Sequence, residues 1–178
     1  MEELPHVLWT YRTTPRRSTG ETPFSMTYGA EAVIPLETSF PMLKTSSFSP
    51  SSNDNLLKRG LDIVGPFPKA TGNKRYLLVD TDYFTKWVEA KPLANIRDVD
   101  AKKFVWKNIV TPFGLPHSLI SDNGLQFDKK DFRRYCCELG VTNIYSTPTY
   151  SQGNGQAETI NKVIVNGIKK RLDGAKGK

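Results

Sequence analysis

The sequence predicts an α/β fold in which a mixed β-sheet carries helices on both faces. From residue 60 onwards, three β-rich runs come first, and a helix, a strand, a helix, a strand and a helix follow them. This order is typical of a mixed sheet that is covered on both sides. Apolar residues make up 38% of the 178 residues and aromatic residues 11%, which is enough to build one folded core.

The three early strands are predicted from apolar runs and turn signals. Residues 61–65 form a short strand that ends at the Gly65-Pro66 pair. Residues 75–84 and 86–93 are rich in residues that favour strands, and only one position separates them. We expect these two runs to pair as a hairpin.

The later elements follow from apolar spacing. Apolar residues at four-residue spacing predict a helix over residues 99–113. We then expect a strand over 117–121, a helix over 129–139 and a strand over 142–146. Residues 153–172 open with glycines and continue as a long amphipathic helix.

Ahead of this domain, which we place at 59–178, lie two further segments. Residues 1–36 contain two short helical stretches, the second with Thr22 as its N-cap and Pro23 at its first position. Residues 37–58 are rich in serine and proline and show no apolar period. They are typical of a linker.

The charge balance favours an anionic partner. Lysine and arginine outnumber aspartate and glutamate by 25 to 18, giving a net charge of +7 and a pI near 9.4. Nucleic acid is the anionic partner that a basic surface most often serves. Ordinary solubility charge is the alternative.

Four other classes of protein do not fit the sequence. Cys136 and Cys137 are adjacent, so they cannot form a disulfide framework, and with His6 and His117 they lack the spacing of a zinc site. No apolar run approaches the length that spans a membrane. The acidic first residues do not resemble a signal peptide, and we expect an intracellular protein.

Three carboxylates stand where metal chemistry needs them. Thirty-five residues separate Asp122 from Glu158, and Asp62 lies inside an apolar run sixty positions before Asp122. If strands 61–65 and 117–121 are parallel neighbours, Asp62 and Asp122 project near each other, and Glu158 closes the site from the last helix. Mg²⁺ prefers such oxygen ligands. We therefore predict a divalent-metal site for phosphoryl transfer.

Each carboxylate also has an ordinary explanation. Asp62 could face water on an edge strand, although an ionised carboxylate in an apolar strand is rare unless it is paired or metal-bound. Asp122 could form the turn that Asp-Asn-Gly favours. Glu158 could be a first-turn glutamate that the helix dipole stabilises. The combination of all three at this spacing favours the metal site.

Two further carboxylates, Asp80 and Asp82, occupy alternate positions of the run 75–84. Alternate residues of a strand share one face. We expect these two side chains to face solvent rather than to form a second metal set.

Four segments resemble the integrase core of plant gypsy-class LTR retrotransposons. They are residues 60–67 (GLDIVGPF), 81–87 (TDYFTKW), 121–124 (SDNG) and 154–158 (NGQAE). The resemblance implies a ribonuclease H-like fold with a five-stranded mixed sheet. It also implies a catalytic triad that binds two Mg²⁺ or Mn²⁺ ions, whose members match Asp62, Asp122 and Glu158.

The order of segments differs from that of the family. Residues 2–35 resemble a stretch that follows the glutamate helix in the family, but here they precede the first strand. The chain therefore resembles a circular permutant or a mosaic of two tandem copies. Arg59 also replaces the family's tryptophan before the first catalytic strand.

The resemblance implies DNA 3′-end processing and strand transfer, with element ends and target DNA as partners. It allows for a homo-oligomer and implies a nuclear location, reached from a cytoplasmic particle. The polar, glycine-rich loop 147–155 and the basic face of the last helix are then expected to contact nucleic acid. An ordinary connection and a plain Glu–Lys helix pair are the alternatives. The expected contacts are Tyr150, Gln152, Asn154, Lys162 and Lys169.

Two main functions thus remain open from the sequence. The first is an integrase-like polynucleotidyl transferase. The second is a catalytically inactive nucleic-acid-binding remnant of a retrotransposon polyprotein. A Mg²⁺-dependent nicking and strand-transfer assay separates the two. A nuclease of the same fold is a less favoured third, because the thirty-five-residue spacing and the segment NGQAE fit integrases better.

Overall fold

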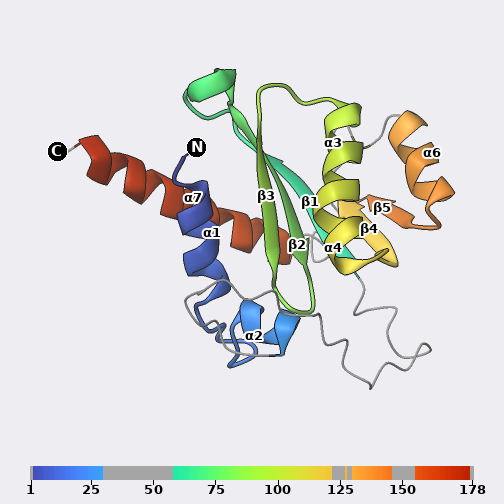
Figure 1. Cartoon of the computed structure of the whole chain (residues 1–178), viewed down its shortest axis with the longest axis horizontal. Helices are drawn as coiled ribbons and strands as arrows, with labels where there is room; N and C mark the ends of the chain where they lie inside the picture. The colour runs from blue at the N-terminus through green and yellow to red at the C-terminus, as the bar shows by residue number, and fades with distance from the viewer. Residues whose placement is uncertain (1, 30–57, 122–126, 128–129, 146–154, 177–178) are drawn as a thin grey trace.

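A computed structural model gives the fold of the chain (Figure 1). It describes residues 2–29, 58–121, 127, 130–145 and 155–176, and within the last helix it describes the side chains of 159–170. Within these ranges, no helix is both long and apolar enough to cross a membrane.

The sheet has five strands in the order β3-β2-β1-β4-β5. β1 (Lys58–Val64), β2 (Tyr76–Asp82) and β3 (Val88–Leu93) form an antiparallel meander. β4 (Ser118–Ser121) lies parallel to β1, and β5 (Thr142–Tyr145) lies parallel to β4. The predicted hairpin and the mixed sheet are therefore confirmed, and the condition that the strands before Asp122 and around Asp62 lie parallel is met.

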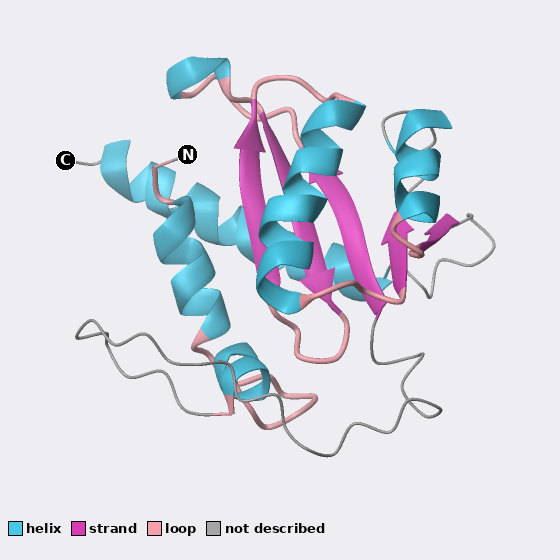
Figure 2. Ribbon diagram, turned by 45° about the vertical axis from the view of Figure 1, so that its right-hand side comes forward, coloured by secondary structure: helices cyan, strands magenta, loops and turns pink. Residues whose placement is uncertain are grey.

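One face of the sheet is covered by helices that follow the meander (Figure 2). α3 (Asp98–Phe104), η3 (Val105–Val110) and α4 (Thr111–Phe113) run on as one helical stretch, and α6 (Lys130–Glu138) lies beside it. η3 is a π-type turn just before Pro112, which has no N–H to donate to an i−4 carbonyl. The buried side chains on this face include Leu61, Leu78, Phe104, Ile109, Phe127 and Phe132.

The opposite face is covered by α1 (Leu4–Arg12) and α7 (Gly155–Lys176), which cross each other (Figure 1). The isoleucine stripe of α7 and the apolar side of α1 share one cluster with the sheet. Its buried members are Leu4, Val7, Leu8, Tyr11, Leu77, Val79, Val88, Ile160, Ile164 and Ile168.

α2 (Pro23–Tyr28) begins and ends as its sequence predicts. The Ser25 N–H donates to the Thr22 side chain at 2.9 Å, which caps the helix. Gly29 closes it in the left-handed region at φ 71°. The predicted linker lies almost wholly outside the described residues, apart from Lys58, which begins β1.

Candidate active site

Asp62 lies on β1, the central strand of the sheet, and both of its carboxylate oxygens are held. Oδ1 accepts a hydrogen bond from the Ile63 N–H at 2.7 Å, and Oδ2 accepts one from the side-chain amide of Asn161. The residue is half-buried rather than solvent-facing. Because β1 has neighbours on both sides, the alternative of an edge-strand aspartate is wrong.

Asn161 is a site residue that the sequence did not reveal. It lies on α7, is 5% exposed and donates across to Asp62 from a helix 99 positions later in the chain. Among the described residues, nothing donates to its buried Oδ1. Its position three residues after Glu158 was an available signal, since residues at i and i+3 share a helix face.

The pairing of β1 with β4 aligns the residues that directly precede the first two predicted carboxylates. Leu61 pairs with Ser121 between the parallel strands β1 and β4. Asp62 follows directly after Leu61, and Asp122 follows directly after Ser121. Asp122 itself lies outside the described residues.

Glu158 belongs to the first turn of α7, as predicted, but its side chain is not among those described. The helix that carries Glu158 reaches Asp62 through Asn161. The structure thus places Asp62 and the glutamate helix together and leaves the meeting of the three carboxylates as a prediction. Within the described ranges, no group of three His, Cys, Asp or Glu side chains could hold a metal ion.

Of the five predicted nucleic-acid contacts, two are described. Lys162 and Lys169 are both exposed on α7. They are seven positions apart, two helical turns, so they project on the same side of the helix. Tyr150, Gln152 and Asn154 lie outside the described residues.

The expectation that Asp80 and Asp82 face solvent is wrong. Asp80 is fully buried and pairs with Arg59, whose Nε donates to Oδ2 at 2.9 Å. Arg59 Nη1 also donates to Asp82 Oδ2 at 3.2 Å. The two aspartates do share a face, but that face is the one covered by α3 and α4, so a buried arginine from β1 neutralises them.

Burial changes the acidity of this pair. Burial raises the pKa of Asp80 to about 6, and the Arg59 guanidinium offsets part of that rise. Arg59 is itself 4% exposed and stacks over the Phe113 ring at 5.0 Å. The pKa of Arg59 is raised because its neighbouring carboxylates outweigh the effect of its burial.

The raised pKa predicts how Asp80 affects stability with pH. Asp80 binds its proton more tightly in the folded chain than in the unfolded chain, where its pKa has the ordinary value of 3.8. The stability from this group is therefore full below about pH 3.8 and is lost as the pH rises to about 6. Urea unfolding at pH 4, 5, 6 and 7 should show the wild type losing stability relative to Asp80→Asn across that window. A pH-independent difference between the two would contradict the assignment.

Tyr83 lies over Gly60 next to the candidate site. A Cβ at position 60 would come within 2.5 Å of the Tyr83 hydroxyl, so only glycine fits there without movement. Burial and the nearby carboxylates of Asp80 and Asp62 raise the pKa of Tyr83 above its ordinary value. The phenol therefore stays protonated at neutral pH and can only donate or accept as a neutral hydroxyl.

Comparison with known proteins relates the stretch that carries Asp62 and Asp122 to a family. The profile of the family described as "Integrase core domain" matches residues 60–151. The chain is 35% identical over 101 residues to the Gag-Pol polyprotein of Avian reticuloendotheliosis virus, covering 57% of this chain and 9% of that protein. It is 25% identical over 104 residues to the Retrovirus-related Pol polyprotein from transposon 412 of Drosophila melanogaster, covering 58% and 8%.

Among solved structures, the chain is similar to one in a simian T-cell lymphotropic virus intasome determined in complex with PP2A regulatory subunit B56 gamma. The match has a TM-score of 0.52 at 21% identity and covers 59% of this chain and 37% of the other. At this identity the match supports the fold, which is the ribonuclease H-like mixed sheet with flanking helices. The chain spans less than a tenth of each of the two curated relatives.

Proposed function

The chain belongs to the integrase core domain family, and on that premise we propose that it is a polynucleotidyl transferase. In this proposal it nicks DNA near a 3′ end and joins that end to target DNA. The observation that carries the proposal is the contact between Asp62 on the central strand and Asn161 on the helix of Glu158. It brings together two of the three elements on which the predicted triad lies.

The proposed catalytic and metal-binding residues are Asp62, Asp122 and Glu158. The pairing of Leu61 with Ser121 supports the first two, because these paired residues come directly before Asp62 and Asp122 on neighbouring parallel strands. Glu158 is supported by its place one turn before Asn161 on the same helix face.

A divalent ion, Mg²⁺ or Mn²⁺, fits the described part of this site. Asp62 offers a carboxylate, and the buried Oδ1 of Asn161 beside it is an amide oxygen that accepts nothing among the described residues. Hard divalent cations prefer such oxygen ligands. Two bound ions would supply the charge that activates water or a 3′-hydroxyl at the phosphodiester. Asn161 and the Ile63 N–H fix the Asp62 carboxylate in place.

DNA is the proposed partner, both as element ends and as target. Lys162 follows directly after Asn161 and is exposed, so it can reach a phosphate next to the site. Lys169 extends the same side of α7 by two turns. Tyr150, Gln152 and Asn154 are proposed as further contacts from the loop that precedes α7. With DNA as the partner, we propose a nuclear location that is reached from a cytoplasmic particle.

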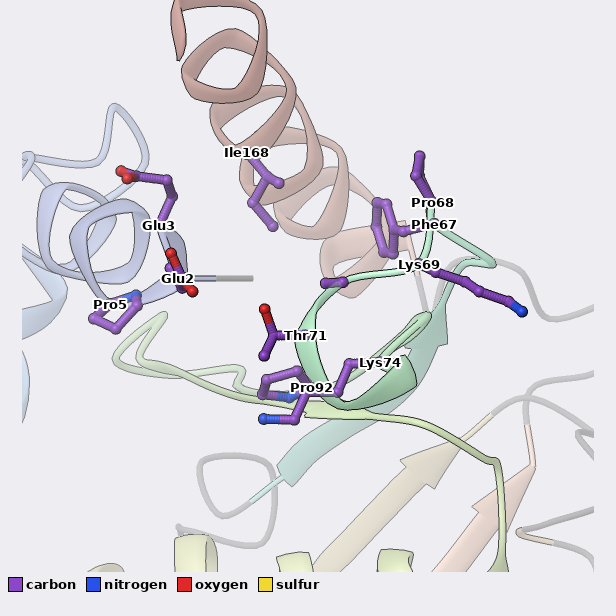
Figure 3. A pocket seen from close by; sticks show the side chains of 11 residues that line it. Glu2, Glu3, Pro5, Phe67, Pro68, Lys69, Thr71, Lys74, Pro92 and Ile168 are labelled. Carbon is purple, nitrogen blue, oxygen red and sulfur yellow. The ribbon is translucent and has the colours of Figure 1, made fainter. Parts of the chain in front are cut away.

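We further propose that the chain derives from a plant gypsy-class retrotransposon and carries its segments in permuted order. The start of α1 lies beside α7, because Glu2, Glu3 and Ile168 line one pocket of about 740 Å³ (Figure 3). Ile168 lies eight residues before the end of α7, about 12 Å along the helix. A chain that passed from α7 into α1, as the family's order requires, would therefore need only a short connection.

The proposal is tested on the full chain with labelled duplex DNA. We expect Mg²⁺-dependent nicking and strand transfer that EDTA abolishes, together with DNA binding that weakens as salt rises. Salt-sensitive binding without any turnover would contradict the catalytic proposal and identify a nucleic-acid-binding remnant. Absence of both binding and turnover would contradict DNA as the partner.

A further inference from the structure

α1 sits in a trough that the rest of the chain forms. The four buried side chains of α1 face the sheet and α7, and each is 4–7% exposed. The two helices approach closely where α1 crosses α7, because a Cβ at Gly167 would lie 2.9 Å from Val7 Cγ1. The trough floor is apolar, so burying α1 there accounts for much of the stability of this face.

Polar contacts hold the C-terminal end of α1 against β3. The Arg12 guanidinium donates twice to the Val88 carbonyl of β3, and its Nη2 pairs with Glu89 Oε1 at 2.8 Å. It also stacks 4.1 Å over the Trp87 ring. α2 adds Tyr28, whose ring centroid lies 5.3 Å from that of Trp87. Residues 4–28 thus bind the remainder of the chain with the apolar core and polar rim of a peptide-binding interface.

Only one covalent connection joins this segment to its trough. It runs through residues 30–57, which are twenty-eight positions. A connection of that length can reach roughly 90 Å when extended, several times the radius of gyration of roughly 16 Å expected for a domain of this size. Both cysteines are free, so no disulfide adds a second link. The contacts described above therefore determine that α1 binds such a trough. They do not determine whether the trough belongs to the same copy of the chain or to another.

We propose that the segment formed by α1 and α2 also docks in the trough of a second copy of this chain, so that two copies exchange these helices. Each copy would then supply α1 to its partner and receive the same contacts in return, as a twofold-symmetric exchange requires. This inference goes beyond the proposed activity and does not depend on it.

Docking within one chain competes with the exchange. A tether of this kind holds the segment at an effective concentration of about 1 mM. At micromolar protein the exchanged form is therefore a minority, and its share grows where copies are concentrated. An experiment must trap the exchanged form covalently.

A pair of cysteines at positions 7 and 167 can trap the exchanged form as a disulfide. A Cβ at Gly167 lies 3.9 Å from Val7 Cβ, within the range of about 3.5–4.5 Å that a disulfide requires. Two full-length variants, Val7→Cys and Gly167→Cys, are made in a background where Cys136 and Cys137 are serine. They are mixed at 100 μM with oxidised glutathione as the oxidant. An efficient disulfide between them requires that α1 of one copy docks in the other, and a control measures the yield from chance collision.

The expected result is a covalent heterodimer of about 40 kDa, twice the 20.0 kDa chain, with the 7–167 link identified by mass spectrometry. The matched control pairs Val7→Cys with Val163→Cys, an exposed position of the same helix, and should give at least tenfold less. The double variant Val7→Cys/Gly167→Cys should close within one chain and stay monomeric. A 7–167 yield no higher than that of the Val163→Cys control would overturn the proposal.

Discussion

Replacing Asp62 with asparagine is expected to abolish Mg²⁺-dependent strand transfer while the chain stays folded. The substitution removes the negative charge that a divalent ion needs and keeps the shape of the side chain. The loss should be on the order of a thousandfold or more, as for groups that act on the reacting atoms. Strand transfer by wild type and variant is compared on the same labelled duplex.

The fold should tolerate this change because the asparagine side chain retains an oxygen that can accept from the Ile63 N–H. Thermal unfolding followed by circular dichroism checks that point. The matched control is Asp100→Asn, an aspartate on α3 whose partner is the exposed Arg97. It should leave strand transfer unchanged. Full activity in the Asp62→Asn variant would refute the catalytic role of Asp62.

Replacing Arg59 with methionine is expected to have the largest effect on stability. Asp80 is fully buried, and Arg59 is the cation that neutralises both it and Asp82. Removing one partner of a buried ion pair leaves an uncompensated charge, which costs about 3–5 kcal/mol. Urea unfolding at pH 7.5, where Asp80 is ionised in the wild type, measures the loss.

Two comparisons separate the buried charge from other effects of the change. The double variant Arg59→Met/Asp80→Leu should recover most of the loss, because it replaces the pair by apolar side chains. Arg97→Met removes the exposed partner of Asp100 and should change stability very little. If Arg59→Met costs no more than Arg97→Met, the buried pair does not have the role assigned to it.

Local patterns predicted most of the architecture. The hairpin of β2 and β3 follows from two strand-rich runs with a short gap. The parallel pairing of β1 with β4 was only a condition of the predicted site, and the structure meets it. Residues 99–113 are helical as expected, but the π-type turn before Pro112 was not foreseen. A π-type turn is defined by its i→i+5 backbone hydrogen bonds, which the spacing of apolar side chains does not report.

The polar contacts between residues far apart in the chain could not be predicted from the sequence. Asp80 has the alternating position of a solvent-facing residue, and its partner Arg59 lies on another strand 21 positions earlier. Asn161 resembles a polar residue on an exposed helix face, whereas it is buried against Asp62. A single sequence shows neither pairing, because both depend on how distant elements pack.

The residues of the candidate site were also predicted only in part from the sequence. Asp62 was predicted as a metal ligand from its apolar surroundings. The structure places it on the central strand next to α7, and its role as a ligand stays a prediction. Asp122 and Glu158 were predicted from spacing and from the resemblance, and their convergence with Asp62 stays a prediction. The basic residues Lys162 and Lys169 are exposed, as phosphate contacts must be.

The fastening of Arg12 to β3 also bears on aggregation. β3 is an edge strand, and an edge strand presents unpaired backbone groups that can recruit a strand from another molecule. Arg12 occupies the Val88 carbonyl, and Pro92 in the same strand has no N–H to offer. α1 thus also protects the edge strand β3 from pairing with a strand of another molecule. A chain that loses this helix exposes both an apolar trough and an open sheet edge, and it should precipitate rather than remain a soluble monomer.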